Sequence, residues 1–262
     1  VVDGAVLLLE PRRMAARAAA RRIAAERRTA LGGDAVGYHV RFDRKATART
    51  RVISMTYGIF LRRLQDDPFL DGIGAVLFDE IHERSLDADL ALAMARKTQL
   101  DARPELRLVA MSATLDAAPI AQFLGDATVV TSAGRSYPVA IRHLASPGDR
   151  EMDRAVATAV AAAVAESTGD VLVFLPGVGE IRRAAAALSA LAERERPVMM
   201  ALYGDLPAEE QDAVLRRADR RKIVLSTNVA ESSVTIENVT AVVDTGLVRV
   251  LRFDPGVGVD RL

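Results

Sequence analysis

A short apolar run that ends in two acidic residues constrains this chain most. Residues 74–78 read Gly-Ala-Val-Leu-Phe, and Asp79 and Glu80 follow them directly, with His82 two positions further on. Such a run, bounded by polar residues, is typical of a strand buried on both faces of a parallel sheet. Ligands of open α/β sheets bind beyond the carboxyl ends of their strands. We therefore predict that the two carboxylates face a binding crevice.

A second run of the same kind follows further along the chain. Residues 106–111 are largely apolar and lead into Ser112-Ala113-Thr114. The interval leaves room for one helix, so the two runs predict a strand, helix, strand unit. In phosphoryl-transfer enzymes of this architecture an Asp at such a position holds magnesium, and a neighbouring acid can orient the attacking water. Asp79 and Glu80 fit these two roles, although adjacent acids are more often solvated loop charges.

Six short motifs occur in order along nearly the whole chain. They are residues 10–16 (Glu-Pro-Arg-Arg-Met-Ala-Ala), 55–58 (Met-Thr-Tyr-Gly), 79–82 (Asp-Glu-Ile-His), 112–114 (Ser-Ala-Thr), 174–177 (Phe-Leu-Pro-Gly) and 227–236 (Thr-Asn-Val-Ala-Glu-Ser-Ser-Val-Thr-Ile). Each is weak alone, but together they resemble the DEAH-box group of superfamily 2 RNA helicases, closest to its bacterial HrpB-type branch. Ile81 stands where the name of the box has Ala.

The resemblance implies an α/β fold of two RecA-like parallel-sheet lobes in tandem. Lobe one is expected over residues 1–135 and lobe two over residues 136–262, because the strand and helix alternation breaks near Thr131 to Pro138 and then resumes. The later strands are predicted at residues 171–175, 197–202, 223–227 and 241–244. Residues 248–259 alternate around a Pro-Gly pair, which predicts a C-terminal β-hairpin on the second lobe.

The resemblance also assigns catalytic roles, with ATP and Mg²⁺ bound in a cleft between the lobes. Asp79 is expected to hold the magnesium through water, and Glu80 to stand beside the metal and position the attacking water. His82 is expected to link this site to Ser112 and Thr114, so that hydrolysis alters the spacing of the lobes. Without the flanking motifs, a local ion pair or cap is the more ordinary role for His82.

Three residues are implied to contact the nucleotide itself. Arg22 is expected to stack on the adenine, and Thr235 and Glu237 to lie near the ribose. Glu237 stands where many relatives have Asp. Leu215 occupies the position of the aromatic ring that commonly covers the other face of the adenine.

Single-stranded RNA, or possibly DNA, is the implied partner, moved with 3′ to 5′ polarity. Lys plus Arg equals Asp plus Glu at 35 each, so any nucleic-acid site must be local. The pattern of Arg12, Arg13, Arg17, Arg21 and Arg22 by itself also fits the solvated face of an amphipathic helix. The implied contacts are to phosphates and sugars and therefore independent of base sequence. They are Arg12, Arg13, Thr56, Gly58, Gly177, Thr227 and Asn228.

Two features set this chain apart from the full family pattern. It contains no Gly-x-x-x-x-Gly-Lys-Ser/Thr loop, and it stops at Leu262 without an arginine-rich sixth motif. We expect a fragment of a longer ATPase, with a natural degenerate ATPase as the alternative. Negligible ATP turnover is expected from these residues alone. The competing function is a non-catalytic RNA-binding or partner-binding remnant of the same fold.

Composition excludes several other classes. No apolar stretch approaches the ~20 residues that span a bilayer, and the absence of cysteine removes thiolate chemistry. We expect a cytoplasmic protein. A dinucleotide fingerprint fails because Leu77 stands at its third glycine position, and a zinc-protease motif fails because Leu86 replaces its second histidine.

Overall fold

Two compact units make up the chain. The computed structural model describes residues 2–113, 117–132, 134, 137–144, 151–231, 234–250, 252–254 and 256–261. The units are Val1–Tyr137 and Pro138–Leu262, called lobe 1 and lobe 2 below. Each has its own sheet and its own hydrophobic core, so each is described by itself.

The sheet of lobe 1 has six strands. In chain order they are β1 (Ala5–Glu10), β2 (Val36–Val40), β3 (Asp43–Lys45), β4 (Val52–Thr56), β5 (Ile73–Phe78) and β6 (Arg107–Ala110). Their order across the sheet is β3-β2-β4-β1-β5-β6. The predicted strands at residues 74–78 and 106–111 are confirmed as β5 and β6, which pair in parallel.

One strand departs from the predicted parallel sheet. β3 runs antiparallel to β2, which makes the lobe 1 sheet mixed. The reason is the connection between them, which consists of Arg41 and Phe42 alone. Two residues can close a hairpin but cannot form the crossover that a parallel pair needs. Phe42 adopts a left-handed backbone, with φ of +66°, to complete this turn.

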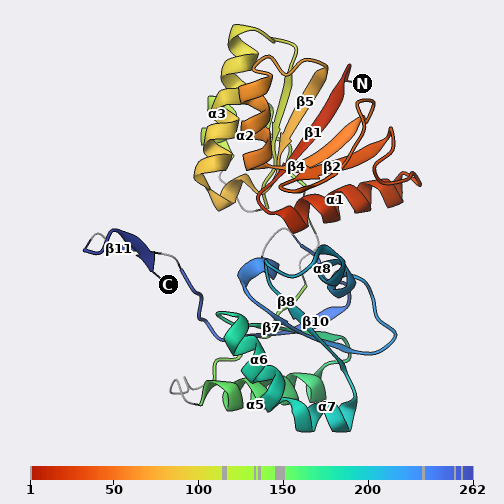
Figure 1. Ribbon diagram of the computed structural model, residues 1–262, viewed down its shortest axis with the longest axis vertical. Helices are drawn as coiled ribbons and strands as arrows, with labels where there is room; N and C mark the ends of the chain where they lie inside the picture. Colours follow the sequence, from red (N-terminus) through yellow and green to blue (C-terminus); the bar gives the residue numbers. More distant parts are fainter. Residues whose placement is uncertain are drawn as a thin grey trace. The chain divides into compact units, whose positions relative to one another are not determined.

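Helices cover both faces of the lobe 1 sheet (Figure 1). α1 (Arg13–Glu26) lies on one face, and α2 (Tyr57–Asp66) and α3 (Leu86–Asp101) lie on the other. The apolar side chains of β1 and β5 therefore meet helices on both sides, which explains why their sequences are continuous apolar runs. Between β5 and α3 the chain forms one 3₁₀ turn, η1 (Ile81–Glu83), and a short helix α4 (Ala118–Phe123) follows β6.

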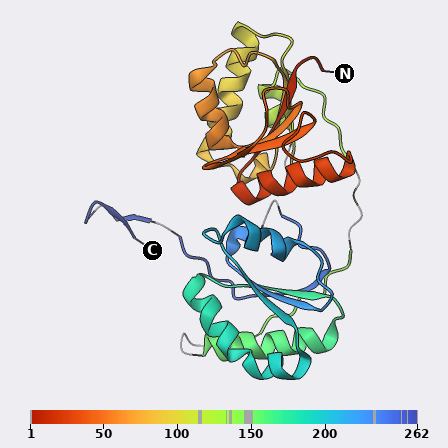
Figure 2. The ribbon, with the colours of Figure 1, turned by 45° about the vertical axis from the view of Figure 1, so that its right-hand side comes forward.

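Lobe 2 has an all-parallel sheet of four strands, again between helices. The strands are β7 (Asp170–Phe174), β8 (Val198–Leu202), β9 (Lys222–Ser226) and β10 (Val239–Asp244), in the order β10-β7-β9-β8. All four strands predicted for this lobe are confirmed, with bounds that differ by one or two residues. The helices are α5 (Met152–Glu166), α6 (Val178–Ala187), α7 (Ser189–Glu195) and α8 (Ala208–Leu215), with a 3₁₀ turn η2 (Asn228–Ala230) after β9. Figure 2 shows α5 and α7 together on one face of this sheet.

The predicted C-terminal hairpin is present but shorter than its alternating sequence. β11 (Arg252–Asp254) pairs antiparallel with β12 (Val259–Arg261), and residues 248–250 precede it without strand pairing. The turn is held by the Gly258 amide, which donates to the Asp254 carbonyl oxygen over 2.8 Å. Gly258 has φ of +71°, a conformation that glycine adopts without a steric cost. None of the described helices is long and apolar enough to cross a bilayer.

Candidate functional site

Backbone pairing brings the carboxyl ends of three strands of lobe 1 to one edge. Beyond the last ladder residues, the Asp79 amide donates to the Leu9 carbonyl oxygen over 2.9 Å. The Ile81 amide donates to the Met111 carbonyl oxygen over 3.2 Å, which ties the segment after β5 to the segment after β6. Glu10, which ends β1, therefore lies at the same edge as Asp79. This edge is where ligands of open α/β sheets bind.

The backbone around the acidic pair is unusual. Glu80 and Arg84 both adopt left-handed conformations, with φ of +52° and +51°, and they bracket the 3₁₀ turn that contains His82. Residues other than glycine rarely hold such angles unless the surrounding structure imposes them, and such strain gathers at functional sites. The Asp79 carboxylate supports the turn by accepting the Glu80 amide over 2.9 Å.

His82 lies between an acid and a hydroxyl. Its Nδ1 is 3.4 Å from Glu80 Oε2 and 3.2 Å from Ser112 Oγ. Ser112 follows β6, so the imidazole joins the ends of two neighbouring strands. Thr114, the other predicted partner of His82, lies outside the described residues. Which ring nitrogen carries the proton depends on the tautomer, and either tautomer allows one hydrogen bond at Nδ1.

Buried carboxylates dominate the electrostatics of this edge. Glu10 is 3% exposed, and burial, followed by the charges of Asp79, Glu80 and Glu83, raises its pKa to about 8. Burial also raises the pKa of Asp79, against the opposing effects of the Glu80 amide and of His82. Like charges held together out of water are costly unless a cation joins them.

This cluster fits a magnesium ion that keeps most of its water. Mg²⁺ prefers oxygen ligands and is usually held by one or two carboxylates together with water and substrate phosphates. Among the described residues no group of three or more His, Cys, Asp or Glu is arranged to chelate a metal directly. Asp79 with Glu80 beside it is therefore a donor set suited to water-mediated binding rather than to a closed protein cage.

The RNA-contact candidates of lobe 1 follow β1 and β4, which are adjacent parallel strands. Glu10 pairs in register with Thr56, so the residues that follow each strand lie at the same sheet edge. Arg12 caps α1 and its Nη2 lies 3.7 Å from Glu83 Oε2, while Arg13 is exposed. Gly58 is exposed in the first turn of α2.

One arginine of α1 is placed differently from the prediction. The sequence pattern places Arg17 with the arginines of a solvated or RNA-facing surface, but it is 6% exposed. It lies on the side of α1 that also buries Met14 and Ala20. Arginine can bury its aliphatic stem in this way, which a hydrophobicity pattern cannot reveal.

Two residues at this edge were quoted in motifs without any assigned role. Glu10 is the buried acid described above, and Tyr57 donates its hydroxyl hydrogen to the Asp79 carbonyl oxygen over 2.6 Å. The signal for Glu10 is its place directly after the apolar residues of β1, the same pattern that singled out Asp79. No sequence signal connects Tyr57 with Asp79, because the contact depends on the packing of α2 on the sheet.

The RNA-contact candidates of lobe 2 also share a sheet edge. Phe174 of β7 pairs in register with Ser226 of β9, so Gly177 and Thr227 follow neighbouring strand ends. Gly177 occupies the N-cap position of α6, and Thr227 that of η2, whose first residue is the exposed Asn228. Gly177 is buried, and a Cβ there would meet Arg249 Nε at 2.9 Å.

The nucleotide candidates are surface residues within their own lobes. Arg22 lies on α1 of lobe 1 and forms an ion pair with Glu26. Thr235 and Glu237 of lobe 2 are exposed in the segment before β10. Leu215 is the last residue of α8 and is half-buried.

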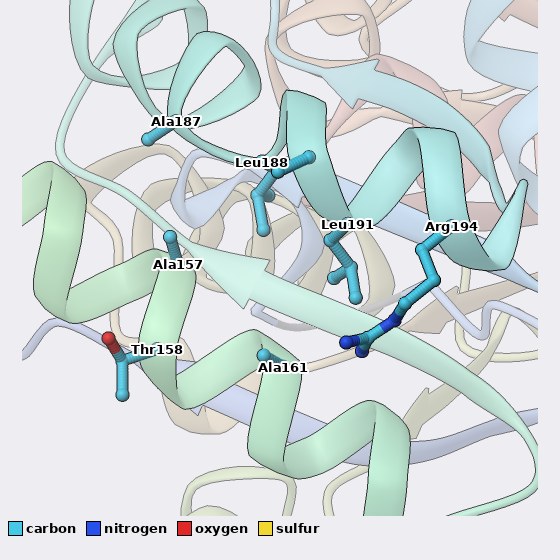
Figure 3. Close-up of a pocket in the computed structure, with 8 residues that line it drawn as sticks. Ala157, Thr158, Ala161, Ala187, Leu188, Leu191 and Arg194 are labelled. Carbon is cyan, nitrogen blue, oxygen red and sulfur yellow. The ribbon is translucent and has the colours of Figure 1, made fainter.

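Two surface hollows are lined by residues other than those of the acidic edge. One, of about 380 Å³, lies between α5 and α7 of lobe 2 and is lined mainly by small apolar side chains with Thr158 and Arg194 (Figure 3). The other, of about 470 Å³, lies between α2 and the β2–β3 hairpin of lobe 1. Its arginines outnumber its single acid, Asp66, so it favours anions. They are Arg41, Arg44, Arg62 and Arg63.

Two α/β lobes, with an Asp-Glu-x-His turn after a strand of the first, are the arrangement that the helicase resemblance predicts. The helicase conserved C-terminal domain matches residues 155–255. The chain is 44% identical, over its whole length and 32% of the relative, to the ATP-dependent RNA helicase HrpB of Escherichia coli. It is 38% identical, over 97% of its length and 36% of the relative, to the probable ATP-dependent RNA helicase DHR2 of Saccharomyces cerevisiae.

The solved structures agree with these relatives. The crystal structure of the Escherichia coli DEAH/RHA helicase HrpB matches 99% of this chain and 33% of that one, with a TM-score of 0.88 and 44% identity. Over nearly its whole length the chain is similar to helicases of the DEAH/RHA group, and the predicted α/β fold with RecA-like lobes is confirmed. It spans about a third of the length of these relatives.

Proposed function

We propose that the protein acts as an ATP-dependent RNA helicase that couples ATP hydrolysis to 3′ to 5′ movement along single-stranded RNA. The observation that carries this proposal is the acidic edge of lobe 1, where Asp79 and Glu80 follow β5 and His82 contacts Ser112. The relatives, which are named ATP-dependent RNA helicases, support the same activity.

Asp79 and Glu80 divide the work at this edge. Asp79 would hold Mg²⁺ through water, and the bound ion would neutralise charge on the phosphates. Glu80 accepts a hydrogen bond from the attacking water and orients it toward the phosphorus. The strained turn after β5 fixes the direction of both side chains, because the Glu80 amide is held by the Asp79 carboxylate.

His82 carries the state of this site to the segment after β6. When the Glu80 carboxylate moves, the His82 imidazole beside it also moves. The same imidazole contacts the Ser112 hydroxyl. We assign Thr114 to the same relay. Arg22, Thr235 and Glu237 are assigned to the nucleotide.

RNA binding in this proposal uses the backbone of the nucleic acid rather than its bases. Phosphate and sugar contacts carry no sequence information, so binding is independent of base sequence. The residues assigned to these contacts are Arg12, Arg13, Thr56, Gly58, Gly177, Thr227 and Asn228. The net charge of the chain is zero, but the basic hollow of lobe 1 concentrates positive charge locally.

Substitution of the proposed water-positioning acid tests this function in the natural full-length protein. Glu80→Gln keeps the size of the side chain but removes its ability to accept a proton. We expect RNA-stimulated phosphate release to fall about 10³-fold, while ATP and RNA binding persist. Glu105→Gln is the matched control, because Glu105 is an exposed acid of the same lobe and should leave the rate unchanged.

The outcomes separate the two candidate functions. Unchanged turnover in Glu80→Gln would remove Glu80 from its assigned role. A wild-type protein that binds RNA without stimulated phosphate release would instead support the binding-only alternative. Repeating the assay with single-stranded DNA of the same length determines whether the 2′-hydroxyl is required.

A further inference from the structure

Tyr57 connects the start of α2 to the acidic pair. It is the first residue of α2 and is 2% exposed. Its hydroxyl donates to the Asp79 carbonyl oxygen over 2.6 Å, and its ring stacks on Phe78 with a centroid separation of 6.4 Å. One buried side chain therefore contacts both the last residue of β5 and the first acid beyond it.

The hydrogen bond from Tyr57 is the second of two that hold the peptide group between Asp79 and Glu80. Its amide hydrogen is donated to the Asp79 carboxylate over 2.9 Å, and its carbonyl oxygen accepts from Tyr57. Both ends of one peptide group are thus held, and this group sets the left-handed backbone of Glu80. Strained conformations persist only where neighbouring groups over-determine them, and Tyr57 supplies one of those constraints.

Core packing alone does not account for the hydroxyl. Phe60, one helical turn away, packs edge-on against the same Phe78 ring and has no polar atom. A phenylalanine at position 57 could fill the same space without burying a hydroxyl. The polar atom has a partner only because the Asp79 carbonyl stands opposite it, and buried polar groups are retained where such a bond is made.

We propose that Tyr57 is a positioning residue. It couples the position of the segment around Thr56 and Gly58 to the position of the peptide between Asp79 and Glu80. This inference rests on the proposed function, in which Thr56 and Gly58 contact RNA and the two acids act on ATP and water. Because Tyr57 lies between Thr56 and Gly58, a shift of the start of α2 moves its hydroxyl. The Asp79–Glu80 peptide follows, and small misplacements of catalytic groups are costly in rate. The hydroxyl of Tyr57 thereby links RNA binding to the rate of hydrolysis.

The test compares two tyrosine-to-phenylalanine variants in the natural full-length protein. Tyr57→Phe keeps the ring stack and removes the bond to Asp79. Tyr38→Phe is the matched control, because Tyr38 is also 2% exposed and donates one bond, to Asp43 Oδ2 over 2.9 Å, away from the acidic edge. ATP hydrolysis is measured with and without RNA, together with the KM for ATP, the Kd for RNA and the thermal midpoint.

We expect Tyr57→Phe to lower the RNA-stimulated kcat about 10-fold, with the KM for ATP and the Kd for RNA changed less than about twofold. Tyr38→Phe should retain the full stimulation. A Tyr57→Phe protein with wild-type stimulation would overturn the inference. So would an equal loss with and without RNA that accompanies a lower thermal midpoint than that of Tyr38→Phe, because this is the result of a purely structural role.

Two further variants keep the result interpretable. Tyr57→Leu removes both ring and hydroxyl, so impairment in Tyr57→Leu with a normal Tyr57→Phe would assign the effect to packing and overturn the inference. Glu80→Gln, measured alongside, reports on the proposed function itself. Wild-type turnover in Glu80→Gln would defeat the proposed function, whereas a dead Glu80→Gln with a fully stimulated Tyr57→Phe would defeat only the inference about Tyr57.

Discussion

Both lobes bury acidic side chains, but the charges around these side chains have opposite signs. In lobe 1, Glu10 ends β1 at the carboxyl edge of the sheet and faces the like charges of Asp79, Glu80 and Glu83. In lobe 2, Asp170 begins β7 at the amino end of the sheet and faces Lys222. A buried charge is therefore not in itself the mark of a site. Burial without a compensating cation is the informative feature, because such an acid either keeps its proton at neutral pH or requires a bound cation.

The carboxyl edge of lobe 2 sharpens this contrast. Burial of Glu180 tends to raise its pKa, but hydrogen bonds from the backbone, Arg249 and Arg183 outweigh it, and the net pKa is lowered. Arg249 and Arg183 approach the same Glu180 oxygen at 2.9 and 3.1 Å. Glu180 is thus compensated by two arginines, whereas the charges that shift the pKa of Glu10 at the corresponding edge of lobe 1 are those of other acids.

Breaking the compensated pair should have the largest effect on stability. Lys222 is fully buried, with Nζ donating to the Val214 and Arg216 carbonyl oxygens over 2.8 and 2.7 Å and lying 3.6 Å from Asp170 Oδ2. Lys222→Met leaves the buried Asp170 without its cation and two carbonyls without their donor, although the residue 222 amide still donates to Asp170 Oδ1. We therefore expect a loss of about 3 kcal/mol in the free energy of unfolding. Urea denaturation followed by circular dichroism measures it.

Lys97→Met is the control for this change, because Lys97 pairs with Asp101 on the surface and its loss should change the free energy of unfolding far less than the loss of Lys222. Adding Asp170→Asn to Lys222→Met should recover part of the loss, since no charge is then buried unpaired. A loss in Lys222→Met no larger than in Lys97→Met would show that the buried pair does not distinguish the two lobes.

Removing the uncompensated acid should act in the opposite direction. The pKa of Glu10 is about 8 in the folded protein and 4.5 ordinarily, so the folded state binds this proton more tightly than the unfolded chain. Stability from this group is complete below pH 4.5 and is lost as pH rises toward 8. Glu10→Gln removes the loss, so at pH 8 without added metal we expect it to unfold with a free energy on the order of 3 kcal/mol higher than wild type.

The difference in thermal midpoint between Glu10→Gln and wild type, measured as a function of pH, tests this prediction. At pH 4 the Glu10→Gln and wild-type proteins should have equal thermal midpoints, and the difference should open between pH 4.5 and 8. Glu26→Gln, at an exposed acid of α1, should show no such profile. A Glu10→Gln protein that is less stable than wild type at pH 8 would mean that Glu10 is compensated after all, and that the two lobes do not differ.

The sequence allowed the strands to be predicted better than the partners of their polar residues. The apolar runs of β5 and β6 and the Pro-Gly turn of the hairpin are local signals, so their positions could be inferred from composition and spacing. The contact of Tyr57 with Asp79 and the pairing of Asp170 with Lys222 join residues 22 and 52 positions apart. Such contacts depend on which strands and helices become neighbours. The burial of Arg17 escaped prediction for the same reason, since only packing of α1 on the sheet decides which arginine stems are covered.

The smallest expected effect concerns the compensated edge of lobe 2. Arg249 is about half exposed, so Arg249→Met should lower the free energy of unfolding by only about 0.5–1 kcal/mol at pH 7. Because the pKa of Glu180 is lowered in the folded state, this contribution is present above its ordinary pKa and is lost as pH falls. Arg249→Met and wild type should therefore converge in acid, while Arg194→Met, at an exposed pair, should match wild type within about 0.5 kcal/mol throughout. Arg249→Met could instead lower the free energy of unfolding as much as Lys222→Met does. Glu180 would then belong with the buried Asp170–Lys222 pair rather than with solvated surface pairs.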